Sequence, residues 1–336
     1  MVLKIAIIGA GVNGLSCGVQ LAKYYKNLAE ITIISEVFSP HTTGDGSAGL
    51  WGPYLIGSTK SEKIIEWSKI THDFFEELWL SDDSGIAGIC LIPAIRVSSS
   101  NDDIMEDFWK DIVYGWRRLT KYELEKLSNE TGNKFVQGMQ FMTFTAEPIK
   151  LLPYLTEIFK KFNGKLIEGK IENFNDFVKN SNYDVIINCT GLGSKTLIGD
   201  KNVHAIRGQV ARVQAPWMYY TYLDEASNGN YIIPNTESVV IGGTHQMEDY
   251  NTIPDEGDKK FILNGCKQIV PALENASFLF DWVGLRPGRT EVRIEKVITD
   301  DGKIIIHNYG HGGSGVTICW GCATNVLELL KPKSNL

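Results

Sequence analysis

The sequence predicts an α/β protein in which a parallel-sheet domain is interleaved with a second, mainly antiparallel α+β domain. Three short apolar runs, at 3–8, 184–189 and 303–309, are rich in β-branched residues and end in glycine turns, as buried parallel strands do. Between about 203 and 298 the sequence instead alternates strand-like runs with Gly, Pro and Asn, which is typical of antiparallel strands and turns. With 336 residues the chain is long enough for two domains.

The first of these glycine turns has the spacing of a loop that binds a dinucleotide. A strand precedes it, and a helix with Leu15, Val19 and Ala22 on one face follows it, which is the order that such a pocket requires. In the GxGxxG pattern the first glycine allows the tight turn, the second lets the backbone approach a pyrophosphate, and the third lets the helix pack on the strand. The motif consists of Gly9, Ala10, Gly11, Val12, Asn13 and Gly14.

A carboxylate stands after the next predicted strand. The run 31–34 is followed by Glu36, which can accept the hydroxyls of an adenosine ribose and would repel a ribose 2′-phosphate. The helix after the first turn would direct its free N–H groups at the phosphates. The motif by itself leaves an ordinary glycine turn open, and it does not distinguish FAD from a nicotinamide dinucleotide.

The composition argues against several classes of partner and site. A formal charge of −7 and a pI near 5.5 argue against a general affinity for nucleic acid or acidic membranes. The apolar runs are too short for a transmembrane helix, and the N-terminal run is interpreted as a strand rather than an export signal. Cys319 and Cys322 form a CxxC, but it falls in an apolar helical stretch and no second pair stands at metal-ligand spacing. We therefore expect reduced core cysteines and no metal.

The elements between the glycine turns complete the predicted organisation. Small polar residues at 42–49 form a loop that can wrap a cofactor closely. Capping boxes at 59–62 and 120–123 predict the starts of two helices, and Pro148 predicts the start of a third. A further helix is expected at 256–268, and strands are expected at 89–97, 165–171, 203–213, 231–233, 239–241 and 291–298.

The third apolar run leads into a second glycine turn, at 310–315, and into a helix expected at 316–330. Each end of the chain therefore presents a helix N-terminus behind a glycine turn, where the helix dipole stabilises negative charge. One N-terminus can hold a pyrophosphate, and the other can face the part of a flavin that becomes anionic on reduction. This arrangement favours FAD over NAD.

The order of these motifs resembles the D-amino acid oxidase family, which includes the D-aspartate oxidases. The most specific stretch is 307–315, continuing through 320–323, and shorter matches occur at 9–14, 48–51, 188–191, 207–209, 215–217, 242–244 and 284–287. The resemblance implies non-covalently bound FAD in a Rossmann-like domain. That domain would be assembled from 1–58, 145–200 and 299–332, and the substrate-binding domain from 59–144 and 201–298.

The resemblance also implies a reaction and a location. A D-amino acid would pass its α-hydride to flavin N5, O2 would reoxidise the flavin, and the products would be a 2-oxo acid, ammonia and hydrogen peroxide. The implied location is the peroxisomal matrix, because Ser334, Asn335 and Leu336 resemble the address Ser-Lys-Leu, which an import receptor would bind. Assembly into a homo-oligomer is left open.

The residues predicted to contact FAD come from both glycine turns, the acid after the second strand, the small-residue loop and two further strand ends. They are Gly9, Ala10, Gly11, Val12, Asn13, Gly14, Glu36, Thr42, Thr43, Ser47, Gly49, Leu50, Ile171, Thr190, Gly191, Gly312, Gly313, Ser314, Gly315 and Thr317.

Four residues match the family's substrate positions. Arg286 would bind the α-carboxylate, because a planar guanidinium binds a carboxylate in a bidentate manner and so orients the Cα–H bond. Tyr231 matches a tyrosine whose hydroxyl reaches the same carboxylate, the Gly313 carbonyl matches the acceptor for the amino group, and Tyr54 matches a position in the pocket wall. A structural salt bridge is the alternative for Arg286, and packing is the alternative for Tyr231.

His307 and His311 invite assignment as general bases, but hydride transfer needs none. We expect both histidines to support the loop near the flavin.

Substrate preference is the least determined property. His245 stands where D-aspartate oxidases often carry an arginine for the side-chain carboxylate, and Trp51 and Tyr54 resemble the enzymes that act on neutral substrates. Residues 191–194, Gly243 with Thr244, and the tail instead resemble D-aspartate oxidases. Neutral D-amino acids are favoured, a D-aspartate oxidase acting on D-Asp and D-Glu is the alternative, and a non-catalytic FAD-binding protein is a third hypothesis.

Overall fold

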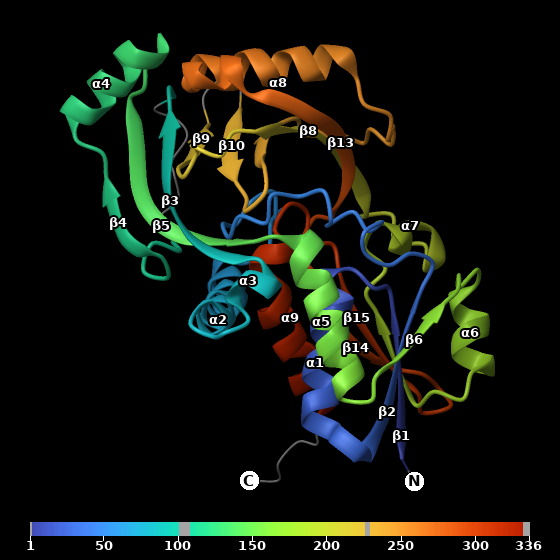
Figure 1. The fold of residues 1–336 in the computed structure, drawn as a ribbon. Helices are drawn as coiled ribbons and strands as arrows, with labels where there is room; N and C mark the ends of the chain where they lie inside the picture. The colour runs from blue at the N-terminus through green and yellow to red at the C-terminus, as the bar shows by residue number, and fades with distance from the viewer. Residues whose placement is uncertain (1, 101–107, 226–228, 332–336) are drawn as a thin grey trace.

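The computed structural model describes residues 2–100, 108–225 and 229–331. It contains a six-stranded sheet, in the lower half of Figure 1, and a nine-stranded sheet in the upper half. The predicted α/β class is confirmed, because the first sheet is largely parallel and the second largely antiparallel.

The six-stranded sheet runs in the order β14-β15-β7-β1-β2-β6. Its neighbouring strands are parallel except for the pair β14 and β15 at one edge. Ile5 in the middle pairs with Ile31 on one side and Val185 on the other, so the prediction that 184–189 joins the N-terminal run in one parallel sheet is confirmed. The strands are β1 (Leu3–Ile8), β2 (Ala29–Ser35), β6 (Lys165–Glu168), β7 (Val185–Asn188), β14 (Arg293–Ile298) and β15 (Ile304–Tyr309).

Strands β1, β7 and β15 are buried on both faces, which explains why they appear in the sequence as largely apolar runs. Ile7 belongs to the same core cluster as Leu15 and Phe159, whereas Ile8 belongs to a cluster with Phe174 on the other face. The helices around the sheet are α1 (Val12–Tyr25), α5 (Pro148–Lys161), α6 (Phe174–Asn180), α7 (Ser194–Leu197) and α9 (Gly315–Leu330), with 3₁₀ turns η1 (Lys26–Leu28) and η2 (Gly191–Gly193).

The nine-stranded sheet has the order β12-β8-β11-β10-β9-β3-β5-β4, with β13 paired to β8 outside this path. Its pairs are antiparallel except for β3 and β9. The strands are β3 (Ile89–Ser98), β4 (Tyr114–Arg118), β5 (Gln137–Ala146), β8 (His204–Gln214), β9 (Thr221–Asp224), β10 (Tyr231–Pro234), β11 (Val239–Gly242), β12 (Gln246–Met247) and β13 (Ser277–Gly288). Its helices are α4 (Lys121–Thr131) and α8 (Glu256–Ile269), which lie at the top of Figure 1, and the 3₁₀ turn η3 (Pro271–Asn275).

Two predictions about strands are wrong in detail. Residues 293–298, assigned to the substrate domain, form β14 and pair with β15 in the six-stranded sheet. The reason is the short turn at 299–303, closed by a hydrogen bond from Thr299 N to Lys303 O, which folds β14 back on β15. The strand expected at 165–171 ends at Glu168, because the backbone of 169–172 turns away to line a cavity.

The helix expected after Thr59 exists, but the capping box predicted for it is wrong. Helix α2 (Ser61–Trp79) begins two residues later and has no side-chain cap. The Thr59 hydroxyl donates to Ile56 O at 2.8 Å and accepts from Val292 N at 2.9 Å, so the hydroxyl is already engaged elsewhere. The second box is confirmed, since Thr120 and Glu123 cap α4 reciprocally.

Helix α2 packs on α9, although 59–144 was assigned to the substrate domain. Gly321 N donates to Thr71 Oγ1 at 3.0 Å, and the Phe74 and Trp320 rings stack with centroids 3.7 Å apart. A Cβ on Gly321 would overlap the backbone of Trp67, so the absence of a side chain allows this close approach. The short helix α3 (Ser84–Ala87) follows α2.

The buried His72 provides a test of the fold. Its ring is 2% exposed, lies against Trp51, Tyr114 and Phe144, and has no partner for Nε2 among the described residues. Burial lowers the pKa of His72 to about 4. Below pH 6.5 the unfolded chain therefore binds a proton here that the folded chain does not, and stability falls as the pH falls toward 4.

We predict that His72→Phe removes this contribution. Between pH 6.5 and pH 5 the variant should lose about 1.5 kcal/mol less unfolding free energy than the wild type. Urea unfolding at a series of pH values measures the difference. Identical pH dependence in the two proteins would contradict it.

Candidate active site

A cavity of about 690 Å³ lies between the two sheets. The carboxyl ends of β1, β2, β7 and β15 open into it, at the edge where open α/β sheets bind ligands. Leu285, Arg286 and Pro287 of β13 contribute the wall from the nine-stranded sheet. The volume is within the range of about 300 to 1,000 Å³ that is usual for small-molecule sites.

At the first glycine turn, on one side of the cavity, the backbone of helix α1 lies directly against the backbone of the turn. Gly9 has a φ of +106°, and a Cβ on Gly14 would overlap the carbonyl oxygen of Gly9, so helix α1 touches the turn directly. A Cβ on Gly11 would meet no protein atom within 4 Å. Helix α1 begins at this glycine without a side-chain cap, which leaves N–H groups available to a ligand.

The second glycine turn is locked to the segment that follows Trp51. A Cβ on Gly312, whose φ is +53°, would overlap the carbonyl oxygen of Leu55. The Ser314 hydroxyl donates to Tyr54 O at 2.8 Å and accepts from Tyr54 N at 2.7 Å. Helix α9 starts here and also lacks a side-chain cap. The uncapped N-termini of α1 and α9 therefore both lie at the cavity, as the sequence predicts.

The residues of the cavity fit a flavin dinucleotide. The Asn13 Oδ1 and Ser47 Oγ atoms are buried in or beside its wall and have no partner among the described residues, so each is available to a ligand. The open space at Gly11 and the uncapped helix suit a pyrophosphate, and the carboxylate of Glu36 also lies in the wall.

The two histidines beside the second turn are neutral near pH 7. Burial lowers the pKa of His311 to about 3 and that of His307 to about 4. His311 Nε2 lies 3.0 Å from the Asn308 Oδ1 acceptor, so this nitrogen is assigned the proton. The expectation that these rings support the loop is consistent with these contacts.

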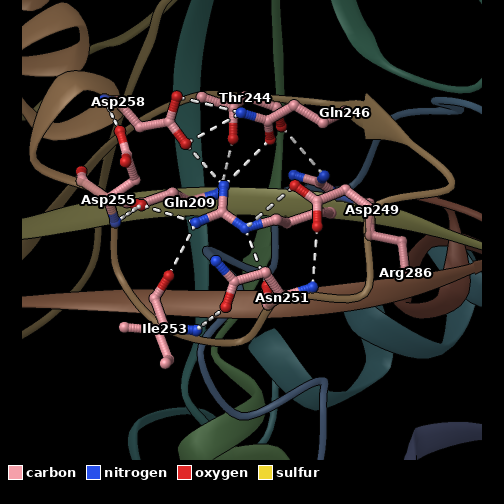
Figure 2. A network of polar contacts seen from close by, with 10 residues as sticks. Gln209, Thr244, Gln246, Asp249, Asn251, Ile253, Asp255, Asp258 and Arg286 are labelled. Atoms are coloured by element: carbon pink, nitrogen blue, oxygen red, sulfur yellow. Dashed lines mark hydrogen bonds and ion pairs between the residues drawn. The ribbon is translucent and has the colours of Figure 1, made fainter.

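The Arg286 side chain extends along β13 over Gly208 of β8. A Cβ on Gly208 would overlap the guanidinium, and Arg286 Nη1 donates to Thr244 O at 3.1 Å (Figure 2). No carboxylate forms an ion pair with Arg286 within residues 2–100, 108–225 and 229–331. The salt bridge considered as the alternative for Arg286 is therefore absent from this part of the chain.

Tyrosines surround that guanidinium. The Tyr231 ring lies against Gly242 and Gly243, where any Cβ would overlap it. Burial raises the pKa of the Tyr231 hydroxyl, and the charge of Arg286 together with a hydrogen bond from it acts in the opposite direction. The Arg286 guanidinium also lies 6.0 Å from the centre of the Tyr54 ring. The structure thus brings three of the predicted substrate residues together.

Most of the predicted cofactor residues line the cavity. They are Gly9, Ala10, Gly11, Val12, Asn13, Glu36, Thr42, Thr43, Ser47, Ile171, Thr190, Gly191, Gly312, Gly313 and Gly315. The other five contact neighbouring backbone instead: Gly14 lies on Gly9, Gly49 on Ala146, Leu50 pairs with Thr145, Ser314 bonds Tyr54, and Thr317 bonds Gly52.

His245 has an exposed side chain, and a Cβ placed on Gly229 would lie 3.9 Å from its Cε1. It follows Thr244 directly, so it lies on the segment that contacts Arg286 through a carbonyl.

Sequence reasoning missed several residues of the site. The Thr244 carbonyl, the bare surface of Gly208, the Asn308 amide and the strand-end residues 169, 170 and 172 all lie at the cavity or at Arg286. Arg207-Gly208-Gln209 was singled out as a motif, which was the available signal, but backbone contacts leave no mark of their own in a sequence.

The absences expected from the sequence concern metals and membranes. Within the described residues there is no cluster of three or more metal-ligating side chains, and no described helix has the length and apolar character needed to cross a membrane. Cys319 and Cys322 are fully buried in α9.

Comparisons with known proteins agree with this geometry. A family model described as FAD dependent oxidoreductase (DAO) matches residues 4–329. A D-amino acid oxidase of Dugesia ryukyuensis is 38% identical over 98% of this chain and 97% of that protein, and a D-aspartate oxidase of Homo sapiens is 34% identical over 99% of both. In fold, the structure is similar to glycine oxidase from Geobacillus kaustophilus, with a TM-score of 0.79 at 19% identity over 97% of this chain and 94% of that one. The chain therefore belongs to the DAO family of FAD-dependent oxidoreductases.

Proposed function

We propose that this protein oxidises D-amino acids, with FAD as its cofactor and O2 as the acceptor, and that neutral D-amino acids are preferred. The observation that carries the proposal is the guanidinium of Arg286, held at the cavity by a carbonyl and a tyrosine but by no described carboxylate. A half-buried cation without an acidic partner is stabilised by an anionic ligand, and the α-carboxylate of an amino acid supplies one.

In this proposal the side chains orient the substrate. Arg286 binds the α-carboxylate in a bidentate manner, the Tyr231 hydroxyl donates to it, and the Gly313 carbonyl accepts from the amino group. Holding both groups sets the direction of the Cα–H bond, so the opposite enantiomer would direct that bond elsewhere. When bound, FAD accepts the two electrons and passes them to O2. Neutral His307 and His311 keep extra positive charge away from the cavity.

Charge near Tyr54 supports the preference for neutral substrates. Burial raises the pKa of Tyr54, the Arg286 charge lowers it, and Tyr231 and then Glu225 raise it, so the Glu225 carboxylate contributes negative potential at this tyrosine. The Arg96 guanidinium forms an ion pair with that carboxylate. Because Arg96 is already paired with Glu225, it is not available to a second carboxylate on the substrate, and Glu225 disfavours one. The alternative, a D-aspartate oxidase, is supported by the 34% identity with the human protein of that name.

The proposed activity predicts enantiomer-specific bleaching. Purified holoenzyme should be yellow, D-alanine should bleach it without O2, and L-alanine should not. With O2, peroxide release should be faster with D-alanine than with D-aspartate at equal concentration. Faster turnover of D-aspartate would establish the alternative preference, and no bleaching with any D-amino acid would leave the hypothesis of a non-catalytic FAD-binding protein.

The cofactor assignment predicts opposite defects at two glycines of one turn. Gly11→Ala should fold normally, because an added Cβ meets no protein atom, but should weaken FAD binding roughly tenfold through lost backbone contacts. Gly14→Ala should instead lower the melting temperature of the apoprotein, because its Cβ overlaps Gly9 O. FAD titration and thermal melting of the apoproteins separate the two effects. Unchanged FAD affinity in Gly11→Ala would contradict this placement of the pyrophosphate.

The substrate assignment predicts that a side chain at position 208 interferes with substrate binding, because it would push the Arg286 guanidinium aside. Gly208→Ala should raise the KM for D-alanine roughly tenfold while FAD is retained, because the guanidinium must move. Arg286→Ala should raise it roughly 100-fold. The control is Gly85→Ala, where an added Cβ meets nothing within 4 Å. A wild-type KM in Arg286→Ala would show that Arg286 does not bind the carboxylate.

Location and assembly are part of the proposal. The tail Ser334-Asn335-Leu336, which lies outside the described residues, resembles a peroxisomal address that an import receptor would bind. Appending these residues to a fluorescent protein should direct it to peroxisomes, and a diffuse signal would count against this location. The mass of the native protein in solution would decide whether copies of the chain assemble.

A further inference from the structure

Arg207 of β8 makes an unusually complete set of hydrogen bonds. The side chain is 2% exposed, and its five N–H groups all have acceptors. Nε donates to Asn251 O at 2.9 Å, and Nη2 donates to Gln209 Oε1 at 3.1 Å and to Ile253 O at 3.0 Å. Nη1 donates to Asp258 Oδ2 at 2.6 Å and to Gln246 Oε1 at 3.2 Å.

These acceptors connect three parts of the chain around one guanidinium (Figure 2). Asn251 and Ile253 belong to the loop before α8, Asp258 belongs to the first turn of α8, and Gln246 belongs to β12. Gln246 is further held by donating from Nε2 to both carboxylate oxygens of Asp258, at 3.0 and 2.9 Å. Arg207 and its partner Asp258 therefore hold β12 in addition to its backbone pairing with β8.

Arg207 lies on the face of β8 opposite to Arg286. Successive strand residues point to opposite faces, and Arg286 occupies the space above Gly208, so Arg207 and Gln209 point away from the substrate side. Thr244 connects strand β8 to the Arg286 side chain through two hydrogen bonds. Its hydroxyl accepts from Gln209 N at 2.8 Å, and its carbonyl accepts from Arg286 Nη1 at 3.1 Å.

The segment 244–246 is thus held at both ends. Gln209 N holds it at Thr244, and the pair Arg207 and Asp258 holds it at Gln246. Since the Thr244 carbonyl is the one described backbone acceptor of Arg286, a shift of this segment would redirect the guanidinium. His245 lies between the two anchors and would move with them.

We propose that Arg207 is a positioning residue for the substrate carboxylate: from the opposite face of β8 it holds segment 244–246, and through the Thr244 carbonyl it sets the direction of Arg286. The inference rests on the proposed binding of an α-carboxylate by Arg286. Lysine cannot replace Arg207 without loss, because it has three donors rather than five and lacks the planar fork.

The test uses the FAD-loaded protein and the variants Arg207→Lys and Gln246→Met. The second keeps the ion pair between Arg207 and Asp258 but releases β12 from it. The matched control is Gln20→Met, which removes another buried glutamine that joins two elements, through Trp320 O at 2.8 Å, away from the substrate residues. For each protein, the dissociation constant of benzoate is measured from the flavin absorbance, and KM and kcat are measured for D-alanine. Benzoate carries a carboxylate but no oxidisable amine.

We expect the benzoate dissociation constant and KM to rise together, roughly threefold to tenfold, in Arg207→Lys and Gln246→Met, which corresponds to one weakened hydrogen bond. Gln20→Met should keep the wild-type values even if its melting temperature falls. A purely structural role would lower melting temperature and FAD content but leave both constants of the folded holoenzyme unchanged, and that result would overturn the inference.

Two further cases are also decided by the experiment: a variant that does not fold, and a wild type without the proposed activity. If Arg207→Lys does not fold, Gln246→Met decides: unchanged constants overturn the inference, and raised constants support it. If the wild type neither binds benzoate nor oxidises any D-amino acid, the proposed function fails and the inference fails with it, whereas a wild type that does both, with unaffected variants, overturns the inference alone.

Discussion

Close contact between backbone atoms, which only glycine permits, is the constraint on which the rest of the structure depends. At one turn Gly14 lies on the carbonyl of Gly9, and at the other Gly312 lies on the carbonyl of Leu55. Because these contacts leave no room for side chains, the uncapped N-termini of α1 and α9 come up to the same cavity. Glycines from both turns line the cavity beside these two helix N-termini, which suits a polyanionic cofactor without a large excess of basic side chains.

Glycine also permits close contacts around Arg286 and Tyr231. Gly208 leaves space for the Arg286 guanidinium, and Gly242 and Gly243 leave space for the Tyr231 ring. Arg286 is then held by a neutral carbonyl and a tyrosine, so no carboxylate of the described residues neutralises its charge. Arg207 has the opposite arrangement, since it is buried, paired with Asp258 and saturated with acceptors. Among the described residues, one arginine thus keeps its charge unpaired at the cavity, as the proposed carboxylate binding requires, and the other is fixed by its partners.

The sequence predicted the parallel sheet, both glycine turns and the cavity edge at which they meet. These features depend on local patterns: an apolar run buried on both faces, glycine at the turn and a helical period after it. It was less successful with domain assignment, because β14 pairs within the six-stranded sheet and α2 packs on α9 as well as against the nine-stranded sheet. It also predicted a cap at Thr59, whose hydroxyl instead contacts Ile56 and Val292. Such choices depend on partners that are remote in sequence, and a capping pattern does not reveal a competing partner.

By itself, then, the sequence determined the class of fold and the family resemblance, and it singled out Arg286 as a candidate cation, because residue type and short-range spacing carry that information. Only the tertiary structure decided which residues surround that cation. The carbonyl of Thr244, the bare face of Gly208 and the network around Arg207 act through backbone atoms and through the pairing of β8 with β12 and β13. Backbone groups are the same in every residue. Which of them lies at a site is therefore set by the packing of distant segments and cannot be inferred from the type of side chain.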